Sequence, residues 1–238
     1  MVGSVQRVRR DTVRWRGGWA RLGPRRGATD VALLTVAASS PIPREALERC
    51  LHRLHDAGYD RVITSALLPR DAAPFADVGF ELHESLHLLV HDLTEIASAR
   101  IASRRLRDTD VPAVLRVDGV GFDEFWRFDA AGLQDAIQAT PAHRARVVPS
   151  SGNDVQGYAV TGRSGDVGYL QRLAVAPDQR RRGVGFGLVV DGLRWLRRHG
   201  AQRAYVNTQY GNAAAVRLYE RSGFVHADEP LIVLGRRL

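Results

Sequence analysis

The sequence predicts a mixed α/β fold made of two successive halves. Short apolar runs of β-type composition alternate with amphipathic helical segments along most of the chain. Gly58, Gly200 and Gly223 follow predicted helices, where a left-handed C-terminal cap is common. With 238 residues and 45% hydrophobic content, the chain can bury one large core or two small ones. We expect a mixed sheet flanked by helices.

The first half, residues 1–97, is predicted to be the smaller unit. Its main helix carries Leu47, Leu51 and Leu54 at helical spacing. The elements expected in order are strand Val31–Ala37, helix Glu45–Ala57, strand Arg61–Leu67, the turn and short helix Pro69–Val78, and strand Glu81–Asp92.

The second half, residues 104–238, contains more elements. Asn212 is expected to cap its last helix in front, and Gly223 behind. The expected order is the start at Leu106–Asp110, helices Pro112–Val120 and Phe122–Ala139, a hairpin of Arg144–Val148 and Val155–Thr161, strand Gly168–Val175, helix Val184–His199, strand Arg203–Thr208, helix Ala213–Ser222, and strands Phe224–Ala227 and Leu231–Leu234.

The order of elements in the two halves is similar. Both contain a helix, a glycine, a strand, a short helix, a Gly-Phe pair and terminal strands, so that Gly79-Phe80 matches Gly223-Phe224. This order predicts a half-repeat, with convergent αβ punctuation as the alternative. The first copy has no arginine-glycine loop before its helix, so we expect no phosphate site there.

The composition excludes several kinds of chemistry. All 34 basic residues are arginine, which rules out a Walker-type Gly-Lys-Ser/Thr loop and a lysine nucleophile. The single cysteine, Cys50, lies on the apolar face of its helix and is expected to be a buried structural thiol. The first residues do not resemble a signal peptide or a membrane span, so we expect a cytoplasmic protein with no membrane partner.

Many of the arginines lie near the start of the chain, and the net charge is +8. A basic cluster of this kind can meet an acidic partner or nucleic acid. We interpret it as a solvated basic face, because no pattern of aromatic stacking residues accompanies it. Nucleic acid binding is therefore not favoured. The cluster comprises Arg7, Arg9, Arg10, Arg14, Arg16, Arg21, Arg25 and Arg26.

The segment Arg180–Gly187 has the character of an anion site. Its closely spaced glycines allow a tight turn with bare backbone N–H groups, and the helix that follows adds a partial positive charge. Both features suit a phosphate or pyrophosphate. A dinucleotide fold is a weak match, because Pro177-Asp178-Gln179 separates the glycines from the strand and the spacing is Gly-x-Gly-x-Gly.

Two blocks of sequence resemble the GNAT superfamily, the Gcn-related N-acetyltransferases. The run from Leu173 to Gly185 is similar to the acyl-CoA motif Gln/Arg-x-x-Gly-x-Gly/Ala, through Arg180, Gly183 and Gly185. The run Asn212–Phe224 is similar to Asn-x-x-Ala-x-x-Leu-Tyr-x-x-x-Gly-Phe. The resemblance covers about Arg104–Leu238. It implies the GNAT fold, in which two parallel strands splay apart, and a degenerate half-GNAT unit in front.

The resemblance also implies a cofactor and residue roles. Acetyl-CoA would be the co-substrate, with no metal. Its pyrophosphate would bind the N–H groups of the loop, and its amide-rich pantetheine arm would pair with the strand before it. Tyr219 would act as the general acid, because an ordinary phenol with a pKa of about 10 stays protonated at neutral pH. The implied cofactor-binding residues are Leu173, Ala174, Val175, Arg180, Arg181, Arg182, Gly183, Val184, Gly185, Phe186 and Asn212.

The sequence does not identify a general base or an acceptor. Asn207 occupies a strand position where protein N-terminal acetyltransferases commonly carry glutamate, and asparagine cannot take a proton. Asp166, Glu220, Asp228, Glu229 or an ordered water stay open as sources of a base. The leading hypothesis is an N-acetyltransferase acting on a primary amine, of a small molecule or a protein N-terminus. The alternative is a catalytically silent acyl-CoA-binding protein. A homodimer also stays open.

Overall fold

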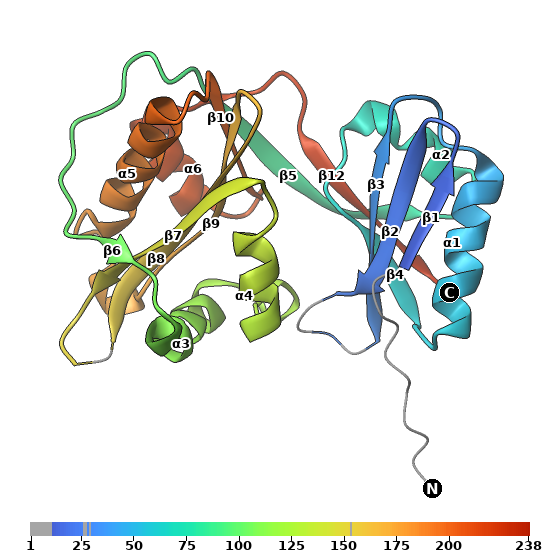
Figure 1. Cartoon of the computed structure of the whole chain (residues 1–238), viewed down its shortest axis with the longest axis horizontal. Coiled ribbons are helices and arrows are strands. Elements are labelled where there is room, and N and C mark those ends of the chain that lie inside the picture. Colours follow the sequence, from blue (N-terminus) through green and yellow to red (C-terminus); the bar gives the residue numbers. More distant parts are fainter. Residues whose placement is uncertain (1–10, 26–27, 29, 153) are drawn as a thin grey trace, which may run out of the picture. The chain divides into compact units, whose positions relative to one another are not determined.

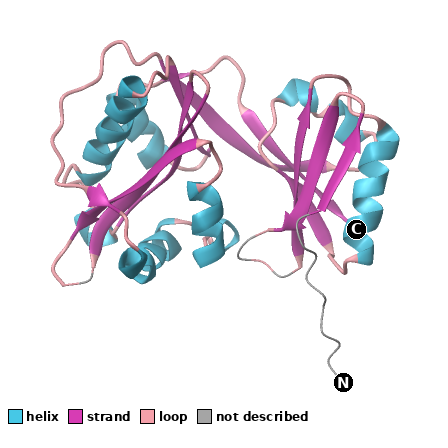
Figure 2. Ribbon diagram, in the orientation of Figure 1, coloured by secondary structure: helices cyan, strands magenta, loops and turns pink. Residues whose placement is uncertain are grey.

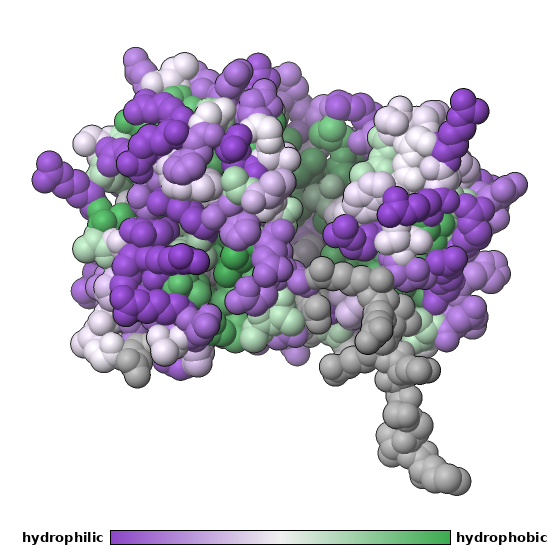
Figure 3. Space-filling view, in the orientation of Figure 1, coloured by the Kyte–Doolittle hydropathy of each residue, from purple (hydrophilic) through white to green (hydrophobic). Residues whose placement is uncertain are grey.

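The computed structural model describes residues 11–25, 28, 30–152 and 154–238 (Figures 1 and 2). These residues form two compact units. The first contains the chain up to Leu86 together with Asp228–Leu238, and the second is His87–Ala227. Each unit is a mixed sheet with helices, as the sequence predicts. Hydrophilic residues cover most of the visible surface of each unit (Figure 3).

The second unit is built on a sheet of mostly antiparallel strands. β7 (Ala142–Pro149), β8 (Val155–Ser164) and β9 (Val167–Val175) follow one another in antiparallel order. β10 (Arg203–Gln209) lies parallel to β9, and the short β6 (Arg104–Arg105) pairs with β7 at the edge. The parallel pair requires a crossover, which α5 (Val184–Arg198) supplies.

Helices cover both faces of this sheet (Figure 2). On one face, α5 and α6 (Ala213–Arg221) pack through a core that includes Leu193, Leu196 and Val206. On the other face, α3 (Val111–Gly121) and α4 (Ala130–Ile137) pack through Val114 and Leu133. The apolar positions of α5 recur at helical spacing, which explains why this helix was predictable from the sequence.

One predicted helix is wrong in its extent. Residues 122–139 do not form a single helix, but a 3₁₀ turn at Glu124–Trp126 followed by α4. Asp129 caps α4, because its carboxylate accepts a hydrogen bond from the Gly132 N–H at 2.6 Å. The backbone N–H of Phe128 donates to the side chain of Asp118 at 2.8 Å. These side-chain bonds take the backbone groups that a continuous helix would have used.

The first unit has the same pairing pattern. β1 (Asp11–Trp15), β2 (Gly18–Pro24) and β3 (Val31–Ala38) are antiparallel, and β4 (Arg61–Thr64) lies parallel to β3. α1 (Arg44–Asp56) makes the crossover, and the short helix α2 (Ala73–Ala76) follows β4. This order, two antiparallel steps and one parallel step around a helix, supports the predicted half-repeat, which stays a proposal.

β1 and β2 were not predicted from the sequence. In these strands the buried residues Val13, Ala20 and Leu22 alternate with exposed arginines such as Arg14 and Arg21. Arg25 departs from the predicted solvated face, because it is only 6% exposed. Arg7, Arg9, Arg10 and Arg26 lie outside the described residues.

The last strand of the chain completes the first unit. β12 (Leu231–Arg237) pairs with β4 on one side and with the beginning of β5 (Glu81–His91) on the other. The end of β5 belongs to the second unit, where it pairs with β11 (Val225–His226). The domain boundaries expected at residues 97 and 104 stay a prediction.

This arrangement predicts that a chain ending at Ala227 loses the first unit selectively. Without β12, the β4 edge is unpaired, and the buried side chains of Val233 and Leu234 are missing from the core. Hydrogen exchange by mass spectrometry should show fast exchange in β3 and β4 and slow exchange in α5. Protection of β4 equal to that of the full chain would contradict the assignment of β12 to this unit.

Candidate cofactor and active site

The candidate site begins where β9 and β10 separate. Their pairing covers Val167–Tyr169 against Arg203–Tyr205, and both strands then continue, β9 to Val175 and β10 to Gln209. A β-bulge marks this point, because Val160 pairs with Arg172 while Thr161 pairs with Leu170, which leaves Gln171 unpaired. A bulge bends its strand and increases the local twist. The strand pair is therefore open beyond Tyr169, as the predicted fold requires.

The residues predicted to bind the pantetheine arm follow the bulge. Leu173, Ala174 and Val175 pair with β8 through Ala159, Tyr158 and Gly157. Their other edge faces the opening toward β10. Backbone groups at such an edge can pair with an extended, amide-rich chain.

The arginine-glycine loop lies between β9 and α5. Gly183 is the N-cap of α5 with φ of 83°, and Arg181 also has a positive φ of 60°. Glycine adopts this conformation without a steric penalty, whereas other residues rarely do. The first N–H groups of a helix have no intrahelical acceptor, and this applies to Val184, Gly185 and Phe186. These N–H groups can donate hydrogen bonds to an anion at the start of the helix.

The side chains of the three loop arginines are exposed. Arg180 is turned toward the strand end, because its Nε donates to the Val175 carbonyl oxygen at 3.3 Å. The backbone of the loop is thus set by Gly183, while Arg181 and Arg182 are free to extend charge into solvent. The order expected from the sequence, in which backbone N–H groups contribute first and side chains second, stays a prediction.

The second predicted block is brought to the same place. Asn212 caps α6 by accepting a hydrogen bond from the Ala215 N–H at 3.1 Å. A Cβ atom placed on Gly185 would lie 3.3 Å from Leu218 Cδ2 and 3.5 Å from Val175 Cγ2. The end of β9, the start of α5 and the face of α6 next to Tyr219 therefore meet at Gly185.

Tyr219 itself is 6% exposed and packs edge-on against Phe224, with ring centroids 5.7 Å apart. Burial raises the pKa of Tyr219 to about 12, and the positive charge of Arg172 offsets a smaller part of this rise. The raised pKa keeps the phenol protonated at neutral pH. A buried, protonated phenol can donate a proton to a leaving group that reaches it.

A buried charge network underlies the face of the sheet that α3 and α4 cover, and the sequence analysis did not find it. Asp118 of α3 is fully buried and accepts hydrogen bonds from Arg172 Nε and Nη2, both at 2.8 Å. The Tyr158 hydroxyl donates to the same carboxylate at 2.5 Å. The Arg172 guanidinium lies between the rings of Phe122 and Phe128, 3.3 and 3.8 Å from their centroids.

This network fixes one wall of the open strand pair. Arg172 also donates to the Trp126 carbonyl oxygen at 2.6 Å, which holds the turn after α3 against β9. Burial and the neighbouring carboxylate of Asp118 raise the pKa of the Tyr158 phenol well above its usual range, so Tyr158 acts as a donor. The signal in the sequence was an isolated Asp among the apolar residues of a helix, and an Arg within an apolar strand.

The acidic residues considered as bases do not converge. Asp166 lies in the turn before β9, at the end opposite to Val175. Glu220 is 3.4 Å from the Nε2 atom of His226. Asp228 and Glu229 belong to the first unit, where Glu229 pairs with Arg70. Asn207 is exposed on β10. The geometry singles out none of these residues as the base.

Cys50 is fully buried in α1 of the first unit, and burial raises the pKa of its thiol to about 11. It therefore stays a neutral thiol at neutral pH, as the sequence predicted for a structural residue. Among the described residues, no helix has the length and apolar character needed to cross a bilayer.

Comparisons with known proteins identify the class. The family model of the Acetyltransferase (GNAT) family matches residues 113–224. The Uncharacterized N-acetyltransferase YjgM of Escherichia coli (strain K12) is 29% identical over 151 residues, which cover 58% of this chain and 90% of that protein. The Mycothiol acetyltransferase of Streptomyces coelicolor is 25% identical over 240 residues, which cover 87% of this chain and 76% of that protein.

A solved structure agrees in fold. The tandem GNAT protein from the clavulanic acid biosynthesis pathway superposes with a TM-score of 0.67 at 12% identity, over 93% of this chain and 79% of that one. Residues 113–224 therefore match the Acetyltransferase (GNAT) family, and the fold agrees with that of GNAT proteins.

Proposed function

We propose that the protein is an acetyl-CoA-dependent N-acetyltransferase that transfers the acetyl group to a primary amine. The observation that carries this proposal is the open edge of β9 beyond Tyr169, which leads directly to the Gly183-capped start of α5. An extended amide-rich arm that ends in a pyrophosphate fits this pair of features. Leu173–Val175 would bind the arm, and the N–H groups from Arg181 to Phe186 would bind the pyrophosphate.

The reaction follows from the same placement. The neutral amine attacks the thioester carbonyl carbon, the C–S bond breaks, and the amine loses a proton. Tyr219 donates a proton to the leaving thiolate, because its raised pKa keeps it protonated, and the phenolate then regains a proton from water. The amine arrives neutral or loses its proton to water, since none of the acidic residues considered above is singled out as a base.

The acceptor is proposed as a small-molecule amine. A relative that aligns over most of this chain is named mycothiol acetyltransferase, and Asn207 provides no carboxylate at the strand position where protein N-terminal acetyltransferases commonly have glutamate.

The second candidate is a catalytically silent acyl-CoA-binding protein, which the scattered positions of the acidic residues favour. Thiol release from acetyl-CoA, measured against a panel of small amines and peptide N-termini, separates the two. Tight CoA binding without release for any amine would contradict the enzyme.

The anion site yields a specific prediction at Gly183. Gly183→Ala should raise the Kd for CoA about tenfold, because alanine at a φ of 83° is strained by about 1 kcal/mol and turns the N–H groups away from the pyrophosphate. Isothermal titration with CoA measures this change. Gly58→Ala, at a φ of 78°, is the matched control. An added Cβ at Gly58 or at Gly183 would meet no atom of another part of the chain within 4 Å.

Gly58 lies after α1 in the first unit, so Gly58→Ala should lose the same amount of stability and keep the affinity for CoA. An equal loss of affinity in both variants would show that Gly183 acts through stability alone.

A further inference from the structure

The segment between β5 and β6 is bound to α5 by arginines. We call residues 94–103 the strap; it contains no helix or strand. Arg194 of α5 donates to the carbonyl oxygens of Ala99, at 2.7 Å, and Ala97, at 3.3 Å. Arg197 donates to the carbonyl oxygen of Thr94 at 3.3 Å. Charged donors therefore satisfy backbone groups that a strap without secondary structure leaves unpaired.

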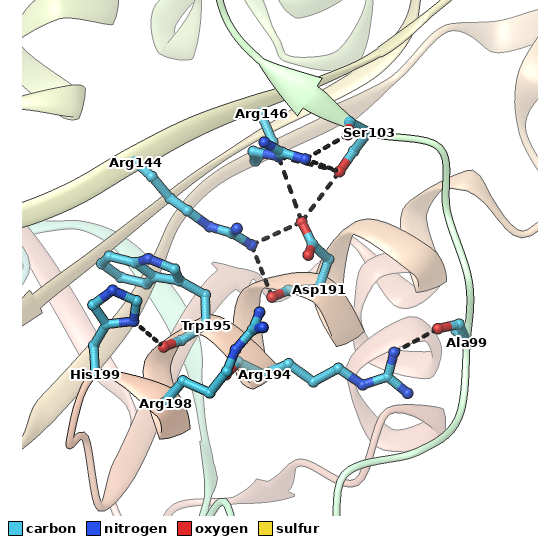
Figure 4. Close-up of polar contacts among 9 residues, drawn as sticks. All are labelled: Ala99, Ser103, Arg144, Arg146, Asp191, Arg194, Trp195, Arg198 and His199. Atoms are coloured by element: carbon cyan, nitrogen blue, oxygen red, sulfur yellow. Dashed lines mark hydrogen bonds and ion pairs between the residues drawn. The ribbon is translucent and has the colours of Figure 1, made fainter.

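The end of the strap is fixed by a second set of contacts (Figure 4). Arg146 of β7 donates to both the carbonyl and the hydroxyl oxygen of Ser103. The Ser103 hydroxyl also donates to Asp191 of α5 at 3.2 Å, and Arg144 donates to the same carboxylate at 2.7 Å. Asp191 is one turn beyond Gly187, so both residues lie on the same face of the helix.

Gly187 is the third glycine of the loop motif, and its backbone conformation does not require glycine, because it is not among the described residues with positive φ. The reason lies in the strap. A Cβ atom on Gly187 would be 2.7 Å from Ile101 Cβ and 3.1 Å from Ile101 Cδ1. Two non-bonded carbon atoms cannot lie this close together, so either the strap or α5 would have to shift. Gly187 is therefore a position where a strap side chain lies directly against the backbone of the helix.

Ile101 packs on residues of the candidate cofactor site. It contacts the small core formed by Val148, Ala159, Val184 and Leu188, against which Leu173 and Val175 also pack. Val184 opens the first turn of α5, and Val175 ends β9. The strap is thus part of the packing that sets the loop between them.

We propose that the strap is a positioning element for coenzyme A, acting through the contact of Ile101 with Gly187. It holds the first turn of α5 so that the N–H groups from Val184 to Phe186 stay aimed at one point. Fixed donors bind an anion better than donors that must first be ordered. This inference rests on the proposed function.

The first test adds a Cβ atom at Gly187. Gly187→Ala should displace the strap and raise the Kd for CoA about fivefold. This loss of affinity is expected even though alanine has a higher helix propensity than glycine and would by itself stabilise α5. Gly119→Ala in α3 raises the helix propensity by the same amount, and its added Cβ meets no other atom within 4 Å. The Kd of this variant should not change. Ile101→Gly removes the same contact from the side of the strap, so it should raise the Kd for CoA as well.

The second test loosens the strap without touching the loop. Arg194→Met keeps the aliphatic stem and removes both bonds to the strap, whereas Arg198→Met removes only a bond to the Arg194 carbonyl within α5. Hydrogen exchange of residues 94–103 in the absence of CoA should rise for Arg194→Met and not for Arg198→Met. Titration with CoA should then show a weaker Kd for the first variant alone.

The possible outcomes distinguish a failure of the strap proposal from a failure of the proposed function. Faster exchange of the strap with an unchanged Kd in both Gly187→Ala and Arg194→Met would overturn the inference, as would an unchanged Kd in Ile101→Gly. If the unaltered chain binds no CoA, the proposed function fails and the inference falls with it. A raised Kd in Gly187→Ala and Ile101→Gly, measured at a temperature where circular dichroism shows both variants folded, would support positioning over a general loss of stability.

Discussion

Tyr219→Phe should lower kcat about a hundredfold while the Kd for CoA stays within about twofold of the unaltered chain. Phenylalanine keeps the ring that packs on Phe224 and removes the one proton donor that we place at the leaving thiolate. A thiolate must then leave without a proton or take one from water, which raises the barrier. Thiol release under saturating acetyl-CoA measures kcat, and titration measures the Kd.

Tyr59→Phe is the matched control for this change. Tyr59 is 7% exposed, close to the 6% of Tyr219, but it belongs to the first unit. Its substitution should leave kcat unchanged. Equal kcat values for Tyr219→Phe and the unaltered chain would remove Tyr219 from the mechanism.

The pH dependence of kcat offers a separate check on Tyr219. Burial raises its pKa to about 12, so the protonated form persists from neutral pH through the range in which an ordinary tyrosine, with a pKa of about 10, would lose its proton. We expect no falling limb in kcat between pH 8 and 10. A limb with a midpoint near 10 that disappears in Tyr219→Phe would contradict the buried, protonated acid.

Asp118→Asn should destabilise the second unit by about 3 kcal/mol, the scale observed when one partner of a buried ion pair is removed. The amide has nearly the shape of the carboxylate, but its NH₂ group must face Arg172 or the Phe128 N–H, which are themselves donors. The Arg172 guanidinium would then be buried beside two rings without a counter-charge. Urea unfolding at neutral pH, followed by a probe in the second unit, measures the loss.

Asp154→Asn is the control for the same chemical change at the surface. Asp154 pairs with Arg116 in the same unit, with side chains 67% and 62% exposed. Exposed pairs contribute little, so the loss should be below about 1 kcal/mol. A loss for Asp118→Asn as small as this would show that the buried network does not support the wall of the open strand pair.

Elements with strong periodicity were predictable from the sequence. The helix from Val184 and the strands on either side of it carry their apolar positions in patterns that local physics fixes. β1 and β2 were missed because their exposed positions are arginines, which hid a period of two. The helix at residues 122–139 was extended too far for two reasons. The Asp129 cap was a local signal that the pattern of apolar residues masked, and the bond from Phe128 to Asp118 joins residues in different elements.

The candidate site divides in the same way. The glycine loop and the block from Asn212 to Phe224 could be predicted because each is contiguous in the sequence. The pair of Arg172 and Asp118 joins residues 54 positions apart, and the bonds from Arg194 to the strap join residues 95 and 97 positions apart. Contacts of this range depend on how the sheet and its helices pack, so the sequence can mark a charged residue within an apolar element but not its partner.

The most direct test of the account is a crystal structure of the chain with CoA. We predict the pantetheine arm paired with Leu173–Val175 between β9 and β10, the pyrophosphate on the N–H groups from Arg181 to Phe186, and the thiol beside the Tyr219 hydroxyl. CoA bound elsewhere, or β9 and β10 closed on each other beyond Tyr169 and Tyr205 with no room for the arm, would contradict it.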